Sequence, residues 1–269
     1  MEKKRVAVCF YGQMRFFDLL NDFYHKFNDN SYKYQYDFFI STWKDFDSDK
    51  LKIPLKGRNY ENEEEVTSKW LDQSGKWTAD NFGNTRKMTY HFHKVNQLKQ
   101  NFEIEKGFGY DRVISVRPDI LLDFKQLEIE LDSLISIRHT VGILDYYRMS
   151  DGCMMLDGDY LFISTTEASN IHANMYSYFF LTYGHLKTNK NMKEGGHWVH
   201  PFYLSEANLH IQKIKIPTSL IRPERDLEVL KSCINDKHAV NIISNHVRQF
   251  GNTNGKSQYT DELKPRKLL

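Results

Sequence analysis

The chain has 269 residues, which is enough for one large α/β domain with a sizeable hydrophobic core. Its 37 basic and 35 acidic residues give a formal net charge of +2, and no basic stripe is visible, which argues against nucleic acid as a partner. Three widely spaced cysteines argue against a disulfide framework or a thiolate zinc site, and no apolar run approaches the ~20 residues that span a bilayer.

The first predicted strand covers residues 6–10 and follows a short basic segment. This apolar run is too short for the core of a signal peptide, so together with the sparse cysteines it predicts a cytoplasmic protein. Gly12 permits a tight turn after the strand, and apolar residues near helical spacing predict a helix over 16–27. Strand, loop and helix form the opening half of a βαβ unit, although one glycine implies no dinucleotide site.

The second predicted parallel strand covers residues 36–43 and ends in polar and aromatic side chains beside the first loop. Residues 44–84 are polar, so we predict an irregular or partly helical insertion there. A loop of that length commonly has a function or is mobile. Apolar spacing predicts a helix over 86–105. Within it, His91 and His93 cannot share a helix face, so we interpret them as ordinary surface histidines rather than a metal pair.

Residues 110–123 are the stretch around which the chain is expected to be organised. Residues 113–116 read as a strand buried on both faces, and Arg117, Pro118 and Asp119 follow it. Proline removes a backbone donor, so the strand should end or bulge there and expose both charged side chains at its carboxyl end. Open α/β sheets bind ligands at that edge.

The chemistry of these two side chains suits a ligand that carries phosphate. Arg117 offers a fork of donors that matches phosphate oxygens, and Asp119 offers hard oxygens to a divalent cation that bridges a diphosphate. The alternative is an ion pair that merely closes a turn, because structural ion pairs also place opposite charges close together.

Downstream of this motif the pattern becomes less regular. Asp157 and Asp159 flank a glycine and offer two carboxylates, although a turn explains both equally well. The remaining predicted strands cover residues 141–144, 160–163 and 211–216, and the remaining predicted helices cover 165–183, 201–208 and 226–234. The polar tail at 251–269 is expected to be frayed.

Four segments, in this order, resemble a group of GT-A-like glycosyltransferases from bacterial and viral polysaccharide loci: VAVCFYGQMRFF, YDFFISTW, YDRVISVRPDILL, and GDYLFIS with the helix start that follows it. The resemblance covers residues 5–43 and 86–220. It implies one α/β, GT-A-like (Rossmann-like) domain over residues 1–250, with a mostly parallel central sheet flanked by helices. It also implies transfer of a sugar from a nucleotide-diphosphate donor to a glycan or lipid-linked acceptor.

Many GT-A enzymes hold a divalent cation, Mn²⁺ or Mg²⁺, with an Asp-x-Asp after a strand. In this chain Arg117 stands in place of the first carboxylate. The resemblance therefore implies that Asp119 binds the metal or the donor ribose, while Arg117 neutralises phosphate directly. His200 or His246, from a C-terminal loop, would complete such a metal site, although a lone histidine is more often just a satisfied side chain.

The resemblance also assigns roles to residues outside the central motif. Gly12, Gln13 and Arg15 would line the nucleotide or diphosphate pocket, and Thr42 and Trp43 would lie near the base or ribose. An inverting enzyme needs a carboxylate base for the acceptor hydroxyl, and Asp159 or Glu167 would serve.

Two other classes of function stay open from the sequence. The replaced first carboxylate also fits a non-catalytic protein that binds a nucleotide sugar or carbohydrate. Sulfuryl transfer from a nucleotide sulfate is the weaker alternative, because that reaction wants a phosphate-cradling loop after the first strand, and one glycine at position 12 supplies it poorly.

Overall fold

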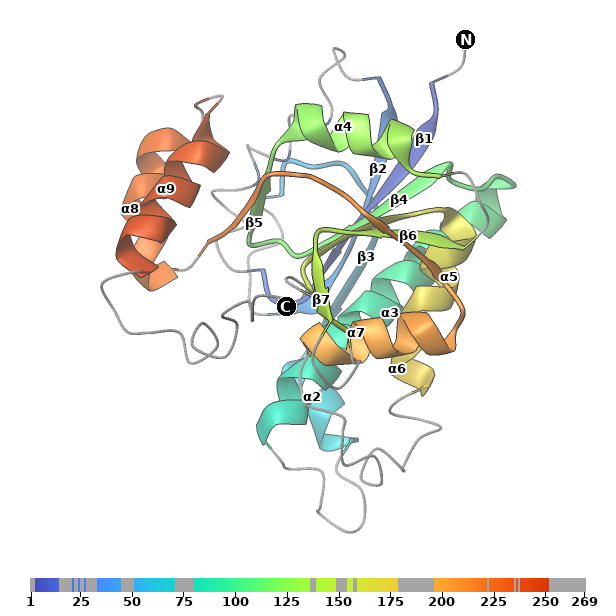
Figure 1. The fold of residues 1–269 in the computed structure, drawn as a ribbon. Helices are drawn as coiled ribbons and strands as arrows, with labels where there is room; N and C mark the ends of the chain where they lie inside the picture. Colours follow the sequence, from blue (N-terminus) through green and yellow to red (C-terminus); the bar gives the residue numbers. More distant parts are fainter. Residues whose placement is uncertain are drawn as a thin grey trace, which may run out of the picture.

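A seven-stranded sheet forms the centre of the protein in a computed structural model (Figure 1). The model describes residues 3–14, 21, 24, 27, 33–44, 51–70, 80–135, 139–148, 154–156, 159–178, 196–221, 223–234, 236 and 238–251. The strand order in the sheet is β10-β6-β9-β4-β1-β2-β3. These strands are β1 (Arg5–Tyr11), β2 (Gln35–Trp43), β3 (Leu55–Glu61), β4 (Arg112–Val116), β6 (Thr140–Ile143), β9 (Leu161–Ser164) and β10 (His210–Lys213).

Two short antiparallel pairs lie outside this sheet: β5 (Ile120–Leu122) with β11 (Thr218–Leu220), and β7 (Tyr146–Arg148) with β8 (Met154–Leu156). The helices are α2 (Glu63–Ser68), α3 (Asp80–Lys106), α4 (Phe124–Ser133), α5 (Thr166–Ala173), α6 (Met175–Ser177), α7 (Gly196–Glu206), α8 (Pro223–Cys233) and α9 (Ala239–Gly251). No helix within the described part of the chain combines the length and apolar character that crossing a bilayer requires.

Most strand pairs in the central sheet are parallel. The strands β4, β1, β2 and β3 pair in parallel, as do β6 and β10, whereas β9 runs antiparallel to both β4 and β6. Figure 1 shows α3, α5 and α7 on one side of the sheet and α4 on the other. The predicted fold class, an α/β domain with a mostly parallel sheet flanked by helices, is therefore confirmed.

The alternation of side chains along β1 divides the core into two layers. Val6, Val8 and Phe10 belong to the cluster that includes residues of α4, α8 and α9, whereas Cys9 and Tyr11 belong to the cluster that includes residues of α3, α5 and α7. All five are at most 1% exposed. Burial on both faces explains why the strand reads as a continuous apolar run.

Several predicted boundaries agree with the structure. β4 ends at Val116 and β5 begins at Ile120, so the chain leaves the central strand at Pro118, as predicted. The predicted helix over 86–105 is present and begins earlier, at Asp80. Most of the predicted helix over 16–27, and residues 252–269 of the predicted tail, lie outside the described residues.

The prediction of an irregular or partly helical insertion over residues 44–84 missed the strand β3, whereas α2 and the start of α3 agree with its helical part. β3 pairs in parallel with β2 at the edge of the sheet, and α2 follows it. Its partly exposed residues include Lys56 and Arg58, because an edge strand is covered less completely than a central one. The polar composition is the reason that this strand was not predicted.

The predicted helix start at residue 201 was too late. The helix α7 begins at Gly196 and contains Pro201.

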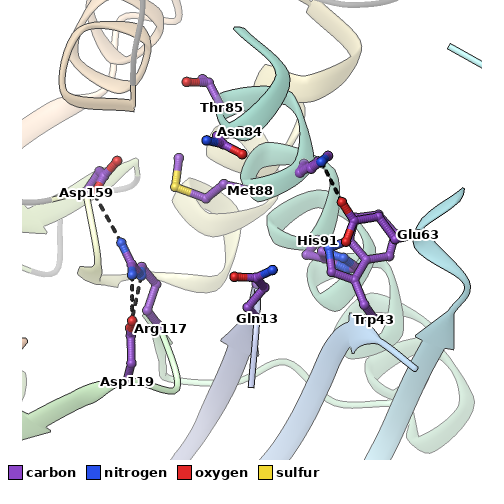
Figure 2. Close-up of a pocket in the computed structure, with 12 residues that line it drawn as sticks. Gln13, Trp43, Glu63, Asn84, Thr85, Met88, His91, Arg117, Asp119 and Asp159 are labelled. Atoms are coloured by element: carbon purple, nitrogen blue, oxygen red, sulfur yellow. Dashed lines mark hydrogen bonds and ion pairs between the residues drawn. The ribbon is translucent and has the colours of Figure 1, made fainter. Parts of the chain in front are cut away.

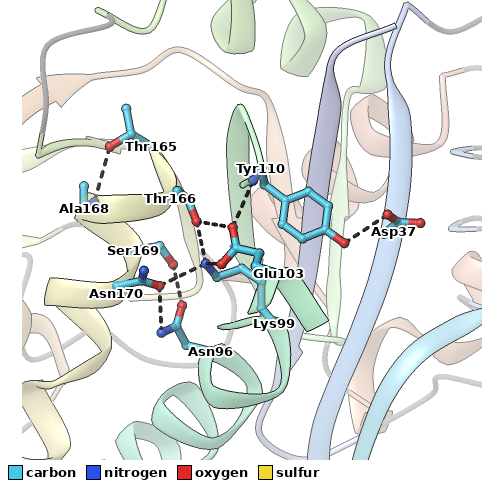
Figure 3. Close-up of polar contacts among 10 residues, drawn as sticks. All are labelled: Asp37, Asn96, Lys99, Glu103, Tyr110, Thr165, Thr166, Ala168, Ser169 and Asn170. Atoms are coloured by element: carbon cyan, nitrogen blue, oxygen red, sulfur yellow. Dashed lines mark hydrogen bonds and ion pairs between the residues drawn. The ribbon is translucent and has the colours of Figure 1, made fainter. Parts of the chain in front are cut away.

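A buried polar network joins α3 to α5 (Figure 3). The Lys99 ammonium group is fully buried and donates to Glu103 Oε2 at 2.8 Å, to Thr166 Oγ1 at 2.6 Å and to Asn170 Oδ1 at 2.9 Å. The other oxygen of Glu103 accepts from the Tyr110 backbone N–H at 2.9 Å. All three ammonium donors therefore have an acceptor, which is the condition under which a buried charge is tolerated.

Replacing Lys99 with methionine should destabilise the protein by about 3–5 kcal/mol, because it leaves the Glu103 carboxylate buried without its counter-ion. Chemical denaturation of the variant and the parent protein measures this difference. Lys106→Met is the matched control on the same helix, since Lys106 pairs with Glu105 at the surface and should change stability by less than about 0.5 kcal/mol. Equal stability of the two variants would contradict the role given to the network.

Candidate functional site

A cavity of about 330 Å³ lies beyond the carboxyl ends of β1, β2 and β4 (Figure 2). Its size is that of a small-molecule site, and its position is the edge where open α/β sheets bind ligands. The cavity is lined by Gly12, Gln13, Trp43, Glu63, Asn84, Thr85, Lys87, Met88, His91, Arg117, Asp119 and Asp159.

The loop after β1 enters the cavity through a backbone conformation that favours glycine. Gly12 has a φ of +98°, and its N–H donates to the Ser41 carbonyl of β2 at 3.2 Å. This turn ends β1 at the cavity rather than prolonging it, and Gln13 then lies within the pocket (Figure 2). The glycine in the sequence was therefore a correct signal of a turn at the site.

Arg117 lies between two carboxylates on one side of the cavity (Figure 2). Its Nε donates to Asp119 Oδ1 at 3.1 Å and its Nη2 donates to Asp119 Oδ2 at 2.7 Å, while Nη1 lies 4.0 Å from Asp159 Oδ1. Burial alone would lower the pKa of Arg117, but the charge and hydrogen bond of Asp119, with smaller contributions from Asp159 and Tyr11, together more than offset this and the pKa is raised. The ion pair that the sequence offered as an alternative is thus present, and it also lines the cavity, while the binding of phosphate and a cation by these two residues stays a prediction.

Backbone hydrogen bonds fix the position of this charged group. The Arg117 N–H donates to the Tyr160 carbonyl at 2.9 Å, and the Tyr11 hydroxyl donates to the Asp159 carbonyl at 2.9 Å. The Ile221 N–H donates to the Asp119 carbonyl at 2.9 Å. The side chain of Tyr11 on β1 and the residues next to β9 and β11 therefore fix the backbone of this group, so the approach of the carboxylates to Arg117 does not depend on long side chains alone.

Aromatic and imidazole rings form the other side of the cavity. Trp43 is stacked on Tyr90, with ring centroids 6.1 Å apart, and meets His91 edge-on at 4.1 Å. The interpretation of His91 as a surface residue is wrong, because its side chain is 0% exposed and lines the cavity. The spacing argument excluded a pair with His93 correctly, but α3 is packed against the sheet along this face. Burial lowers the pKa of His91 to about 3.

Two predicted site residues lie away from the cavity. Thr42 is buried on β2 and faces the same side of the sheet as Phe38 and Ile40, opposite to Trp43, because neighbouring side chains on a strand alternate. Glu167 is exposed and follows β9 at the end that lies beside the start of β4. It therefore lies at the opposite edge of the sheet, and its prediction as a catalytic base does not agree with the geometry.

The structure brings together six of the predicted residues around one cavity: Gly12, Gln13, Trp43, Arg117, Asp119 and Asp159. Arg15 and Asp157 lie outside the described residues. The sequence reasoning missed Glu63, Asn84, Thr85, Lys87, Met88 and His91, which come from α2 and the first half of α3. A prediction of β3 would have indicated these residues, because the segment that follows a further parallel strand begins at the same carboxyl edge of the sheet.

The two histidines considered as metal ligands do not line the cavity. His200 Nδ1 lies 2.8 Å from His172 Nε2 in a buried pair between α7 and α5, and His246 Nε2 lies 3.7 Å from Asp226. Among the described residues, no three histidine, cysteine or carboxylate side chains are grouped so that they could hold a metal ion. Asp119 and Asp159 are the carboxylates beside Arg117 that a cation at this site would meet.

No protein-family model matches the chain, and no curated protein matches it. Solved structures with a similar arrangement include a protein from Desulfovibrio desulfuricans G20 provisionally assigned as a nucleotide-diphospho-sugar transferase, at 11% identity and a TM-score of 0.44, covering 93% of this chain and 99% of that chain. Mouse xyloside xylosyltransferase 1 in its apo form matches at 10% identity and a TM-score of 0.40, covering 79% of this chain and 85% of that chain. At these values neither likeness carries any weight about activity.

Gly12→Ala should destabilise the protein by about 1–2 kcal/mol, because a side chain at a positive φ is strained even though no atom lies within 4 Å of the added methyl group. Gly107→Ala is the matched control, since Gly107 has a φ of +69° and equally open space but follows α3 far from the cavity. Thermal unfolding should show similar losses for both variants. A Gly12 variant as stable as the parent would contradict the strained turn.

Proposed function

We propose that the protein is a glycosyltransferase that moves a sugar from a nucleoside-diphosphate donor to a hydroxyl of a glycan or lipid-linked acceptor. The observation that carries the proposal is the guanidinium of Arg117, held between Asp119 and Asp159 in a cavity at the carboxyl edge of a parallel sheet. A rigid fork of donors suits the oxygens of a diphosphate, and the edge is the one where such sheets bind nucleotides.

The charge of the cavity supports a divalent cation as part of the donor complex. Its described lining includes two cationic side chains, Lys87 and Arg117, and three anionic ones, Glu63, Asp119 and Asp159. Lys87 and Glu63 already form an ion pair at 2.5 Å. The lining is therefore net negative, and a diphosphate would be repelled unless further positive charge entered with it.

The residues present fit such a cation. Mg²⁺ in particular is commonly held by one or two carboxylates, with substrate phosphates and water completing its coordination, and Asp119 and Asp159 supply two carboxylates. A carboxylate has about four lone-pair sites, so the bidentate contact with Arg117 leaves Asp119 able to accept further. When bound, the cation would supply positive charge to the diphosphate.

Within this proposal the residues of the chain act as follows. The bond between the anomeric carbon and the diphosphate oxygen breaks, the diphosphate leaves with the electron pair, and the acceptor oxygen forms the new bond to the anomeric carbon. Arg117 donates hydrogen bonds to the departing diphosphate, where negative charge develops. With the cation held by Asp119, Asp159 would accept the proton of the acceptor hydroxyl, and Gln13 and Trp43 would help to position the donor.

The proposal predicts that uridine or guanosine diphosphate binds the protein, and binds at least about 10-fold more tightly with Mn²⁺ than without it. Isothermal titration calorimetry with each nucleotide, with and without the metal, measures this. Arg117→Lys should weaken binding by about 10-fold or more, because lysine keeps the charge but cannot form two parallel hydrogen bonds. Asp119→Asn should remove most of the effect of Mn²⁺, because the amide is a poor ligand for the cation.

Arg58→Ala is the control variant, because Arg58 is an exposed arginine on β3 that does not line the cavity. It should bind nucleotide as the parent does. Melting temperatures without nucleotide identify any variant that fails to fold. Nucleotide binding that is unchanged in both Arg117→Lys and Asp119→Asn would contradict the site assignment, even if the protein proves to bind nucleotides elsewhere.

A further inference from the structure

His91 is the buried group in the cavity wall for which the proposed chemistry has no use. Its imidazole lines the cavity, and its Nε2 is buried with no hydrogen-bond partner among the described residues. The edge-on contact with Trp43 replaces a hydrogen bond only weakly. A buried donor or acceptor without a partner costs about 1–3 kcal/mol, so a ligand that paired with Nε2 would recover that energy.

A chain of hydrogen bonds determines which nitrogen of His91 carries the proton. The Tyr90 hydroxyl donates to both oxygens of Glu61, at 2.9 and 2.8 Å, and Asn59 Nδ2 donates to Glu61 Oε2 at 2.7 Å. A carboxylate only accepts, so Glu61 fixes the orientation of the Asn59 amide. The same Nδ2 also donates to Ser41 Oγ at 3.1 Å.

The hydrogen bond from Asn59 to Ser41 in turn favours one direction for the hydrogen bond between Ser41 and His91. Its Oγ lies 2.9 Å from His91 Nδ1 and already accepts from Asn59. If the Ser41 hydroxyl donates to Nδ1, every group in the chain is satisfied except Nε2–H. The opposite tautomer would leave the Ser41 hydrogen without an acceptor among the described residues and Nε2 as a bare acceptor, so the Nε2–H tautomer is favoured.

The imidazole is therefore an uncharged donor. Burial lowers the pKa of His91 to about 3, so the ring is neutral at physiological pH and offers a hydrogen bond without a positive charge. Its position complements this property, because Figure 2 shows His91 and Trp43 on the side of the pocket opposite to Arg117, with Gln13 between the two groups. A ligand whose diphosphate reaches Arg117 would extend its uncharged part toward His91.

We propose that His91 Nε2–H donates to the nucleobase of the donor at the carbonyl oxygen on C4 of uracil or C6 of guanine, where cytosine or adenine carries an amino group, so that the site selects a keto base over the matching amino base. This inference rests on the proposed function and assigns a specificity-determining residue within it. Because Nε2 is covered in the structure, contact requires a side chain to move. Met88 is suited to this, since it is unbranched and lines the same cavity one turn earlier on α3.

The keto preference follows from the direction of the hydrogen bond. Uracil carries a carbonyl oxygen at the position where cytosine carries an amino group, and guanine does so relative to adenine, although guanine has in addition a second amino group that adenine lacks. An N–H donor facing an amino group places two donors against each other and leaves both unpaired. Sites built around one hydrogen bond therefore reject the analogue that cannot make it.

Calorimetric titration with uridine, cytidine, guanosine and adenosine diphosphates in Mn²⁺ tests the proposal. The parent protein should bind the keto member of at least one pair at least about 10-fold more tightly than its amino partner. His91→Phe keeps a ring but removes the donor and should abolish that difference. His91→Gln places an amide N–H near the position of Nε2 and should restore part of it. His93→Gln is the matched control and should leave the preference unchanged, because His93 contacts the Ala173 carbonyl instead.

The outcomes separate this inference from the proposed function. A parent protein that binds nucleotides without any keto preference, or a His91→Phe variant that keeps the preference, overturns the role of His91 while leaving the donor site standing. A parent protein that binds none of the four nucleotides overturns both. If the variants do not fold, nitrogen NMR of the parent protein measures the ring-nitrogen shifts of His91 with and without nucleotide. Shifts of the Nδ1–H tautomer, or shifts that the nucleotide does not change, would also overturn the proposal.

Discussion

The fork of hydrogen bonds from Arg117 to Asp119 is the interaction on which the site depends. Pro118 between them ends the central strand β4, and the two side chains fold back onto each other beyond its carboxyl end. Asp119 is 1% exposed, so this carboxylate would be costly without a partner. The guanidinium is the more exposed member, with 23% of its side chain accessible, and it is the group that can turn toward a ligand.

The two sides of the cavity differ in a way that suits a nucleotide sugar. One side carries Arg117 and its two carboxylates, which are charged and whose backbone is held by hydrogen bonds with Tyr11, Tyr160 and Ile221. The other carries Trp43 and His91, which are aromatic and uncharged, together with Glu63, whose charge is paired with that of Lys87. A nucleoside diphosphate has the same polarity, with charge at one end and a flat heterocycle at the other. This complementarity, rather than any distant likeness of fold, is the basis of the proposed function.

Sequence reasoning located the charged side of the cavity and missed most of the aromatic side. The strand before Arg117 is largely apolar and a proline follows it at position 118, so its end could be read directly from the sequence. β3 could not be read in this way, because its less exposed positions after Leu55 include Gly57 and Asn59, so the sequence shows no alternation of apolar and polar residues. Without β3, the sequence did not indicate that the start of α3 lies at the cavity, and His91 was therefore interpreted as a surface residue. The antiparallel direction of β9, which carries Glu167 away from the cavity, likewise depends on pairing between distant segments.

A crystal structure of the protein with uridine diphosphate and Mn²⁺ would test the central claim most directly. The account predicts that the diphosphate oxygens lie within about 3 Å of the Arg117 guanidinium, with the metal ion on Asp119 or Asp159 and the base on the side of His91. A nucleotide bound elsewhere, with Arg117 still closed onto Asp119 and the cavity filled only by water, would contradict it.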